Sequence, residues 1–418
     1  MLYQVGGYLP SRVLRCGADL QLESSEKEEA VKITDINTLV VNARMRNWVF
    51  VKIETDTAGL YGWGEATMEW KTRAVVGCVE DFKPMLLGRD PTRIEFLWQI
   101  MYRHSFFRLG TIGTTAMAGI EQACWDILGK SLGVPVYKLL GGSVRDKVRM
   151  YTHLGGGEMK AVYETFEAGP LIERTAKILE SGYRALKVVC VPYSQPLMGL
   201  AAVKHFAAIM GKLRDSVGDE VDLMVDFHGR TTTGQAIEYI RAIEDLHPFF
   251  CEEPVPPEQP DALLEVRRSV RVPIATGERL ATRWEFRRVC ELQACHVLQP
   301  DLSHCGGLLE ARKIASLGET YLMGIAPHNP NGPVANVVAL HFDLATPNFL
   351  IQEDMLGDVP WRFDVVQTKL RSENGFWLPL DQPGLGVEID EGEARKHPFE
   401  QEILEQMVFH ADGSVAEW

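Results

Sequence analysis

The chain reads LMVDFH at 223–228, FFCEEP at 249–254 and VPIATGE at 272–278. Each run is apolar and ends in acidic side chains, so that Asp226, Glu252 and Glu278 follow one another at intervals of 26 residues. This interval fits one strand, one helix and two loops, the repeat of a parallel α/β fold. Three carboxylates at neighbouring strand ends repel one another unless a cation lies between them. A hard divalent cation with oxygen ligands, usually Mg2+, is therefore expected there.

Five further runs of the same kind extend the pattern on both sides. They are VRMYTH (148–153), ALKVVCV (185–191), HVLQPD (296–301), LMGIAPH (322–328) and FLIQEDM (349–355). Amphipathic stretches such as AAVKHFAAIMGKL (201–213) separate the runs. Eight strand-then-helix repeats, the last with a weak helical stretch, predict a modified (β/α) TIM barrel over residues 146–369. The active site of such a barrel lies at the C-terminal ends of its strands.

The chain before the barrel has a different pattern. Residues 33–67 alternate apolar and polar side chains like an antiparallel meander, and three stretches with helical periodicity follow. Strands followed by helices predict an α+β capping domain over 33–145. Residues 1–32 show only a weak pattern of apolar and polar side chains, and we expect them to form an N-terminal arm. The tail from about residue 370 to 418 contains turn signals, and we expect it to complete the capping domain.

Composition limits the possible partners and location. The net charge of −14 makes nucleic acid and anionic membranes unsuitable partners, while a bound metal ion still allows an anionic substrate. The eight cysteines form no CxxC pair and several lie in apolar runs, so we expect buried thiols in a reducing compartment. No apolar run is long enough to span a bilayer. These features predict a cytoplasmic enzyme.

The strand ends carry further candidates for catalysis. His228 lies two residues after Asp226, and alternation along one strand would direct both side chains to the same face. The same alternation sends Glu253 away from Glu252, which is the preferred ligand of the two. His228 is expected to act as a titratable base beside the metal.

Asp301 and His328 end the sixth and seventh strands, so a carboxylate can orient an imidazole there and make it more basic. Glu353, at the end of the eighth strand, is expected to hydrogen-bond a substrate carboxylate. His153 ends the first strand and faces the barrel mouth. The remaining histidines, among them His304, lack such a context and are expected to have packing or surface roles.

Several phrases together resemble the enolase superfamily, in its mandelate-racemase-like branch. They are GWGEA (62–66), LLGG (139–142), VDFHGR (225–230), EEP (252–254), GERL (277–280), QPDLSHCGG (299–307) and APHNPNGP (326–333). The resemblance covers about residues 33–390 and is greatest to galactonate dehydratase and related acid-sugar dehydratases. It implies Mg2+ bound by Asp226, Glu252 and Glu278, with His228 as the base at C2. His328, paired with Asp301, would be the acid that helps the C3 hydroxyl to leave.

The resemblance also implies substrate contacts and leaves alternatives open. Mannonate dehydratases of the branch resemble this chain at Asn47 and His153, where they contact substrate, but their seventh-strand motif differs. Arg230, at the end of VDFHGR, is a further expected contact. Racemases and cycloisomerases carry Lys-x-Lys on the second strand, whereas this chain has Lys187 followed by Val189, so its chemistry must use histidines.

The expected reaction is dehydration of an aldonate, galactonate by preference, to a 2-keto-3-deoxy acid. Mannonate or gluconate dehydration, and epimerisation or cycloisomerisation of an acid sugar, are the enzymatic alternatives. A binding protein without catalysis is another. The expected partner is a small sugar acid, and the family resemblance together with the arm predicts a homo-oligomer.

Overall fold

The structure is a computed structural model that describes residues 31–155, 167–191, 197, 199–355, 357–401, 409–410 and 412–416. The chain divides into two compact units, residues 1–30 and 31–418, and only the second is described below. The predicted arm over 1–32 therefore lies outside the described residues, apart from its last two positions. Within the described ranges, no helix is long and apolar enough to cross a membrane.

The capping domain begins with the antiparallel meander that the alternating sequence predicts. Strands β1 (Ile33–Ala43), β2 (Arg46–Thr55) and β3 (Tyr61–Glu65) pair in chain order. The helices that follow are α1 (Thr72–Leu86), α2 (Ile94–His104), α3 (Gly110–Leu132) and α4 (Val136–Leu139). Helix α3 packs closely on β3 because the GWGEA stretch has glycines there. A Cβ atom on Gly64 would lie 2.0 Å from the carbonyl oxygen of Gly119.

Eight parallel strands form the barrel, each within or beside one of the predicted runs. They are β4 (Val148–His153), β5 (Ala185–Val188), β6 (Asp222–Asp226), β7 (Cys251–Glu252), β8 (Ile274–Thr276), β9 (Val297–Leu298), β10 (Gly324–Ile325) and β11 (Gln352–Asp354). Neighbours pair in chain order from β4 to β10, and β11 pairs with β4. A parallel bridge between Ile325 and Phe349 joins β10 to the segment before β11 and closes the ring.

A layer of buried side chains, one from each strand or its flank, fills the barrel below the site. Its members are Tyr151, Ala185, Met224, Phe250, Ala275, Val297, Ala326 and Ile351. Side chains two residues apart on a strand point to the same face. Seven of these residues therefore place a polar side chain one layer nearer the C-terminal mouth: His153, Lys187, Asp226, Glu252, Gln299, His328 and Glu353. The apolar layer is the floor of the candidate site.

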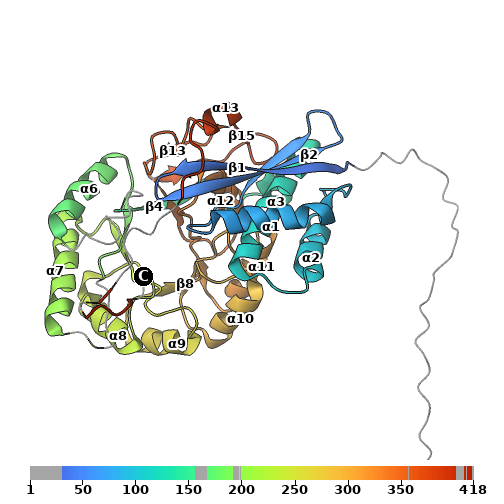
Figure 1. The fold of residues 1–418 in the computed structure, drawn as a ribbon. Helices are drawn as coiled ribbons and strands as arrows, with labels where there is room; N and C mark the ends of the chain where they lie inside the picture. The colour runs from blue at the N-terminus through green and yellow to red at the C-terminus, as the bar shows by residue number, and fades with distance from the viewer. Residues whose placement is uncertain are drawn as a thin grey trace, which may run out of the picture. The chain divides into compact units, whose positions relative to one another are not determined.

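Helices alternate with the strands and follow one another around the barrel (Figure 1). They are α6 (Ala168–Glu180), α7 (Leu200–Val217), α8 (Thr233–Arg241) with the 3-10 turn η1 (Glu244–Leu246), α9 (Pro260–Ser269), α10 (Thr282–Leu292), α11 (Leu308–Thr320) and α12 (Pro333–Ala345). Every residue of α12 is buried, because this helix contacts β3 and α4 of the cap as well as β4 and β11. In the described part of the chain no helix follows β11 before α13 (Glu391–Ala394), so the eighth repeat lacks its helix.

The tail contacts both domains. Its elements are β12 (Val366–Thr368), β13 (Ser372–Glu373), β14 (Phe376–Trp377), β15 (Val387–Ile389) and α13. Glu391 of α13 lies 3.0 Å from Lys52 of β2, and β15 contacts β3, so this part of the tail packs on the cap. β14, however, pairs antiparallel with β4 of the barrel. The domain boundaries at residues 33, 146 and 370 remain predictions.

Two buried carboxylates of the cap accept hydrogen bonds from the N-termini of barrel helices. Glu65, the acid of GWGEA, accepts from the backbone of Gly332 and Ala335 at the start of α12, at 2.5 and 2.9 Å. Glu121 on α3 accepts from the first two residues of α11, at 3.0 and 2.8 Å. The amides at a helix N-terminus have no partner within the helix and carry partial positive charge, so carboxylates stabilise them. These contacts attach the cap to the loops that carry the site.

Candidate active site

The three acids that open the sequence pattern come together at the C-terminal ends of the strands. Asp226 and Glu252 are the last residues of β6 and β7 and lie opposite each other in the parallel register. Glu278 follows β8 by two residues. One carboxylate oxygen from each acid lies within 4.8 Å of the others, and all three come from adjacent strands. The structure thus brings together the predicted metal ligands.

Lys187 of β5 lies among these acids, and sequence reasoning missed its place. Its Nζ is 2.8 and 2.9 Å from the two oxygens of Glu252, 2.9 Å from Glu353 and 3.2 Å from Asp226. Burial would lower the pKa of Lys187, but Glu252, Glu353 and other nearby groups raise it well above its usual range. The sequence pattern draws attention to Lys187 only through the absence of the second lysine of Lys-x-Lys. Its ammonium group is a fixed positive charge inside the acidic cluster.

The acids that face each other repel. Burial raises the pKa of Glu252 well above its usual range, and the charge of Asp226 adds to this. Burial likewise raises the pKa of Glu278, with Glu253 contributing next. Mg2+ binds oxygen at about 2.0–2.1 Å, so two of its ligands lie up to ~4.2 Å apart. Small shifts of the side chains bring all three oxygens within this limit, and the donor set fits Mg2+. That these residues hold the ion remains a prediction.

His228 lies beside this cluster, but not for the reason expected. The strand β6 ends at Asp226, and His228 has a positive φ of 50°, so strand alternation does not direct its side chain. The expectation of one shared strand face is therefore wrong. Instead the backbone N–H of His228 donates to Asp226 Oδ1 at 2.9 Å, and the turn returns the ring Nε2 to 3.3 Å from Asp226 Oδ2. Burial lowers the pKa of His228 despite the nearby Asp226 carboxylate, which favours a neutral ring near pH 7.

Asp301 and His328 lie next to each other across neighbouring strand ends. Nδ1 of His328 is 2.9 Å from Asp301 Oδ2, and Nε2 of the same ring is 3.2 Å from Glu278 Oε2. Burial works to lower the pKa of His328, but the charge of Glu353 and the contact with Asp301 raise it to about 9. His328 is therefore protonated at neutral pH, whereas His228 is neutral. The two histidines differ in the way that a general acid and a general base require.

His304 is a second residue that sequence reasoning missed. Its Nε2 is 3.0 Å from the carbonyl oxygen of Thr67 in the cap, and its Nδ1 is 3.5 Å from Asp301 Oδ2. The ring lines the cavity and its centroid lies 6.3 Å from that of His328. The expected packing role is incomplete, because His304 also faces the site. Its position three residues after Asp301, within QPDLSHCGG, was the available signal.

His153 and Glu353 form a pair on the side of β4 and β11. Nε2 of His153 is 3.0 Å from Glu353 Oε1, and the other carboxylate oxygen of Glu353 accepts from the backbone of Asn329 at 2.8 Å. His153 lines the cavity, as a substrate contact requires, whereas Glu353 is fully buried behind it. Glu353 contacts His153 and Lys187 but does not itself line the cavity. This placement does not support the expected hydrogen bond from Glu353 to the substrate carboxylate.

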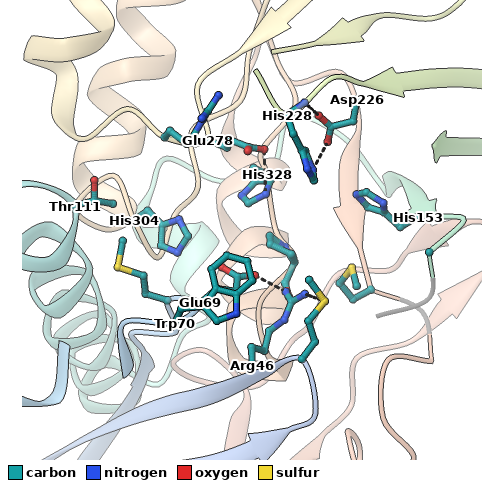
Figure 2. A pocket seen from close by; sticks show the side chains of 16 residues that line it. Arg46, Glu69, Trp70, Thr111, His153, Asp226, His228, Glu278, His304 and His328 are labelled. Carbon is teal, nitrogen blue, oxygen red and sulfur yellow. Dashed lines mark hydrogen bonds and ion pairs between the residues drawn. The ribbon is translucent and has the colours of Figure 1, made fainter. Parts of the chain in front are cut away.

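The cavity above the acids has a volume of about 370 Å3 and lies between cap and barrel. Figure 2 shows the catalytic candidates on one side of it and the cap residues Arg46, Glu69 and Trp70 on the other. The cap contributes Met45, Arg46, Met68, Glu69, Trp70 and Thr111. The barrel contributes His153, Gly155, Asp226, His228, Glu278, Arg279, His304, His328, Pro330 and Met355.

Two predicted substrate contacts do not line this cavity. Asn47 is fully buried and its amide group bonds to the backbone of Glu400 in the tail. Arg230 is also buried and donates to the carbonyl oxygen of Val191. Asn47 is adjacent in sequence to Arg46, which lines the cavity and which sequence reasoning did not select. Arg46 takes the place on the wall that we expected for Asn47, and Arg279 is an arginine at the mouth.

Comparison with known proteins places this geometry in a family. Residues 26–141 match the mandelate racemase / muconate lactonizing enzyme N-terminal domain, and residues 171–393 match the family described as enolase C-terminal domain-like. The chain belongs to the enolase superfamily. This confirms the family resemblance and the expected fold, a modified TIM barrel with an N-terminal capping domain.

Similar proteins include D-galactonate dehydratases of two bacteria. That of Variovorax paradoxus (strain S110) is 41% identical over 397 residues, and that of Verminephrobacter eiseniae (strain EF01-2) is 40% identical over 395. Each comparison covers 93% of this chain and 100% of the relative. Identity at this level over the full relative identifies the present member of the superfamily as a dehydratase, and hence as a lyase.

Solved structures of the superfamily have the same fold. A member from Salmonella Typhimurium has a TM-score of 0.82 and 33% identity, over 88% of this chain and 98% of that chain. An enolase from Pantoea ananatis, solved with bound D-gluconate and Mg, has a TM-score of 0.81 and 29% identity, over 93% and 100%.

Proposed function

We propose that this superfamily member is a Mg2+-dependent dehydratase of an aldonic sugar acid. It would remove the C2 proton, expel the C3 hydroxyl and form a 2-keto-3-deoxy acid, with galactonate as the favoured substrate. The observation that carries the proposal is the convergence of Asp226, Glu252 and Glu278 beside two histidines of opposite protonation. The similarity to D-galactonate dehydratases supports the choice of substrate.

The reaction is difficult because the C–H bond beside a carboxylate is very weakly acidic. Loss of this proton puts two negative charges on the oxygens of an enediolate, and a bound Mg2+ supplies the charge that stabilises them. Asp226, Glu252 and Glu278 would hold the ion. Lys187 adds a fixed positive charge beside these acids, which helps to keep Asp226 ionised, lowers the cost of ionising Glu252 and holds both side chains in place.

The two histidines divide the proton transfers. His228 is neutral near pH 7, so the unprotonated nitrogen of its ring can take the C2 proton. His328 is protonated and can give its proton to the departing C3 hydroxyl. Asp301 accepts from Nδ1 of His328, which fixes the ring and leaves Nε2 directed at the site. His153, on the cavity wall, would contact a substrate hydroxyl, with Glu353 fixing its ring.

Two alternatives share this machinery. Gluconate dehydration is favoured by one observation, the D-gluconate in the related structure from Pantoea ananatis. Epimerisation would use the same pair of histidines to exchange the C2 proton without loss of water. Only dehydration yields a ketone, so the product separates the two reactions.

The test is a screen of the purified enzyme against a library of acid sugars, scored for 2-keto acid. The enzyme is stripped with chelator and assayed with and without added Mg2+. We expect product from galactonate or a close epimer, and only with the ion. Full activity in chelator would contradict the Mg2+ requirement, and proton exchange without 2-keto acid would favour epimerisation.

A further inference from the structure

The arginines of the cavity wall are already paired with carboxylates. Nη1 of Arg46 lies 2.9 Å from Glu69 Oε1, an ion pair drawn in Figure 2. Nη2 and Nε of Arg279 lie 2.5 and 2.6 Å from Glu253 Oε2. Among the described residues that line the cavity, these two are the only lysine or arginine side chains. An anionic group of a ligand therefore finds no arginine on this wall that lacks a carboxylate.

The Arg46–Glu69 pair faces the catalytic groups from the cap. In Figure 2 it lies across the cavity from Asp226, His228 and Glu278. Arg46 also donates to the carbonyl oxygen of Pro330, two residues after His328, so the pair is held by the loop that carries this histidine. The Cα atoms of His328 and Pro330 are therefore at most ~7.6 Å apart, a distance comparable to the length of a six-carbon acid. A substrate bound by its C1 carboxylate at the acidic cluster would extend towards this pair.

The pair is shielded from bulk water. Arg46 is 3% exposed, and the side chain of Glu69 is 16% exposed. Burial works to raise the pKa of Glu69, but Arg46, His304 and His328 outweigh this effect and lower it, so Glu69 keeps its negative charge. The far wall thus presents a guanidinium group and a carboxylate with no net charge between them.

We infer that the Arg46–Glu69 pair makes this site selective for sugar acids with one carboxylate over sugar acids with two. The inference rests on the proposed function, in that it takes the ligand to be an acid sugar bound by its C1 end. A terminal hydroxyl can accept a hydrogen bond from Arg46 and donate one to Glu69, because it is both donor and acceptor. A terminal carboxylate can only accept, and it meets a guanidinium group already neutralised by Glu69.

The size of the effect follows from Coulomb's law. Two unit charges about 6 Å apart, at an effective dielectric constant of about 20, repel enough to change affinity by roughly 100-fold. Residual water and small shifts of Glu69 reduce this figure. We therefore expect that removing the charge of Glu69 changes the preference by on the order of 10- to 100-fold.

The experiment compares galactonate with galactarate, its six-carbon dicarboxylate, by calorimetric titration of Mg2+-loaded full-length protein. All proteins carry His228→Asn, so that turnover does not disturb binding. The parent should bind galactonate at least tenfold more tightly than galactarate. Adding Glu69→Gln should reduce or invert this ratio, because Arg46 can then donate hydrogen bonds to the second carboxylate of galactarate. Adding both Arg46→Gln and Glu69→Gln should remove that gain, since neither charge remains.

A matched control is Glu54→Gln, which removes a carboxylate paired with Lys52 on the surface of the cap and should leave the ratio unchanged. Equal affinity of the His228→Asn parent for galactonate and galactarate would overturn the inference. This comparison needs no variant at position 69, so it remains decisive even if Glu69→Gln fails to fold. An unchanged ratio in folded Glu69→Gln would overturn it as well. Because the readout is binding, failure of the proposed dehydration appears separately, as absence of 2-keto acid with unmodified enzyme.

Discussion

Lys187→Met removes the ammonium group that lies 2.8–3.2 Å from the carboxylates of Asp226, Glu252 and Glu353. Methionine keeps most of the length of the lysine chain, so the change is mainly one of charge. We expect the metal-free enzyme to lose stability, and the loss to depend on pH.

Two physical limits set the magnitude. Each ion pair at about 3 Å is worth about 5.5 kcal/mol at an effective dielectric constant of about 20, so three unrelieved losses would exceed 15 kcal/mol. The variant avoids this cost by taking up a proton on Glu353, whose pKa Lys187 otherwise holds well below its usual range in spite of burial. Protonating a glutamate of ordinary pKa, about 4.3, costs about 1.4 kcal/mol per pH unit, or about 3.7 kcal/mol at pH 7. The smaller cost applies, and it agrees with the roughly 3–5 kcal/mol lost when a buried ion pair is broken.

The sign of the pH dependence follows from the same proton. The folded variant holds a proton that its unfolded chain releases above about pH 4.5, so its stability falls as pH rises. The deficit relative to the unmodified enzyme should grow by about 1.4 kcal/mol per pH unit and shrink to about 1 kcal/mol near pH 5.

The assay is urea unfolding followed by tryptophan fluorescence, in chelator, at pH 5.5, 7 and 8. Lys52→Met is the matched control, because Lys52 pairs with Glu54 and Glu391 at the surface and should cost about 1 kcal/mol or less. A deficit of Lys187→Met that stays below 1 kcal/mol at pH 8, or that does not change with pH, would refute this account of Lys187.

Glu278→Gln should weaken Mg2+ binding at least tenfold by calorimetry and leave the circular dichroism spectrum unchanged; unaltered affinity would exclude Glu278 as a ligand. His228→Asn should abolish dehydration and C2 hydrogen–deuterium exchange together, whereas His328→Asn should lose only dehydration, each by on the order of 10²–10⁴-fold. The reverse pattern would exchange their roles. Because His328 acts while protonated, activity should fall as pH rises through its pKa, and Asp301→Asn should move that limb of the kcat/KM profile to lower pH. A limb that does not move would contradict the pairing. Light scattering should show a homo-oligomer, and a 46.9 kDa species at micromolar concentration would contradict this.

The sequence was sufficient for the order of the strands and for the residues at their ends. Apolar runs that end in Asp226, Glu252 and Glu278 recur at a fixed interval, and in a parallel barrel the chain order of the strands is also their spatial order. This rule alone places the three acids side by side and sets Asp301 next to His328. The proximity of these five side chains could therefore be predicted without a structure.

Side-chain direction in turns, and contacts between domains, could not be predicted in this way. His228 reaches Asp226 through a turn with positive φ, which alternation does not describe. Arg46 and Glu69 meet the site only because the cap packs over the barrel mouth, and no periodic pattern encodes that packing. Asn47, one position from Arg46, illustrates the sensitivity of such predictions: a shift of one residue on a strand reverses the face.

The two cap carboxylates at helix N-termini also bear on synthesis of the chain. Glu65 precedes its partner Gly332 by 267 residues, and Glu121 precedes Leu308 by 187. At about 5–20 residues per second, Glu65 leaves the ribosome roughly ten to fifty seconds before the start of α12. The N-terminal strands and helices of the cap, residues 33–139, can thus serve as a template on which α11 and α12 complete their folding. A circular permutant that places the barrel first reverses this order. Helices α11 and α12 would then be synthesised before Glu121 and Glu65, the acids that cap them.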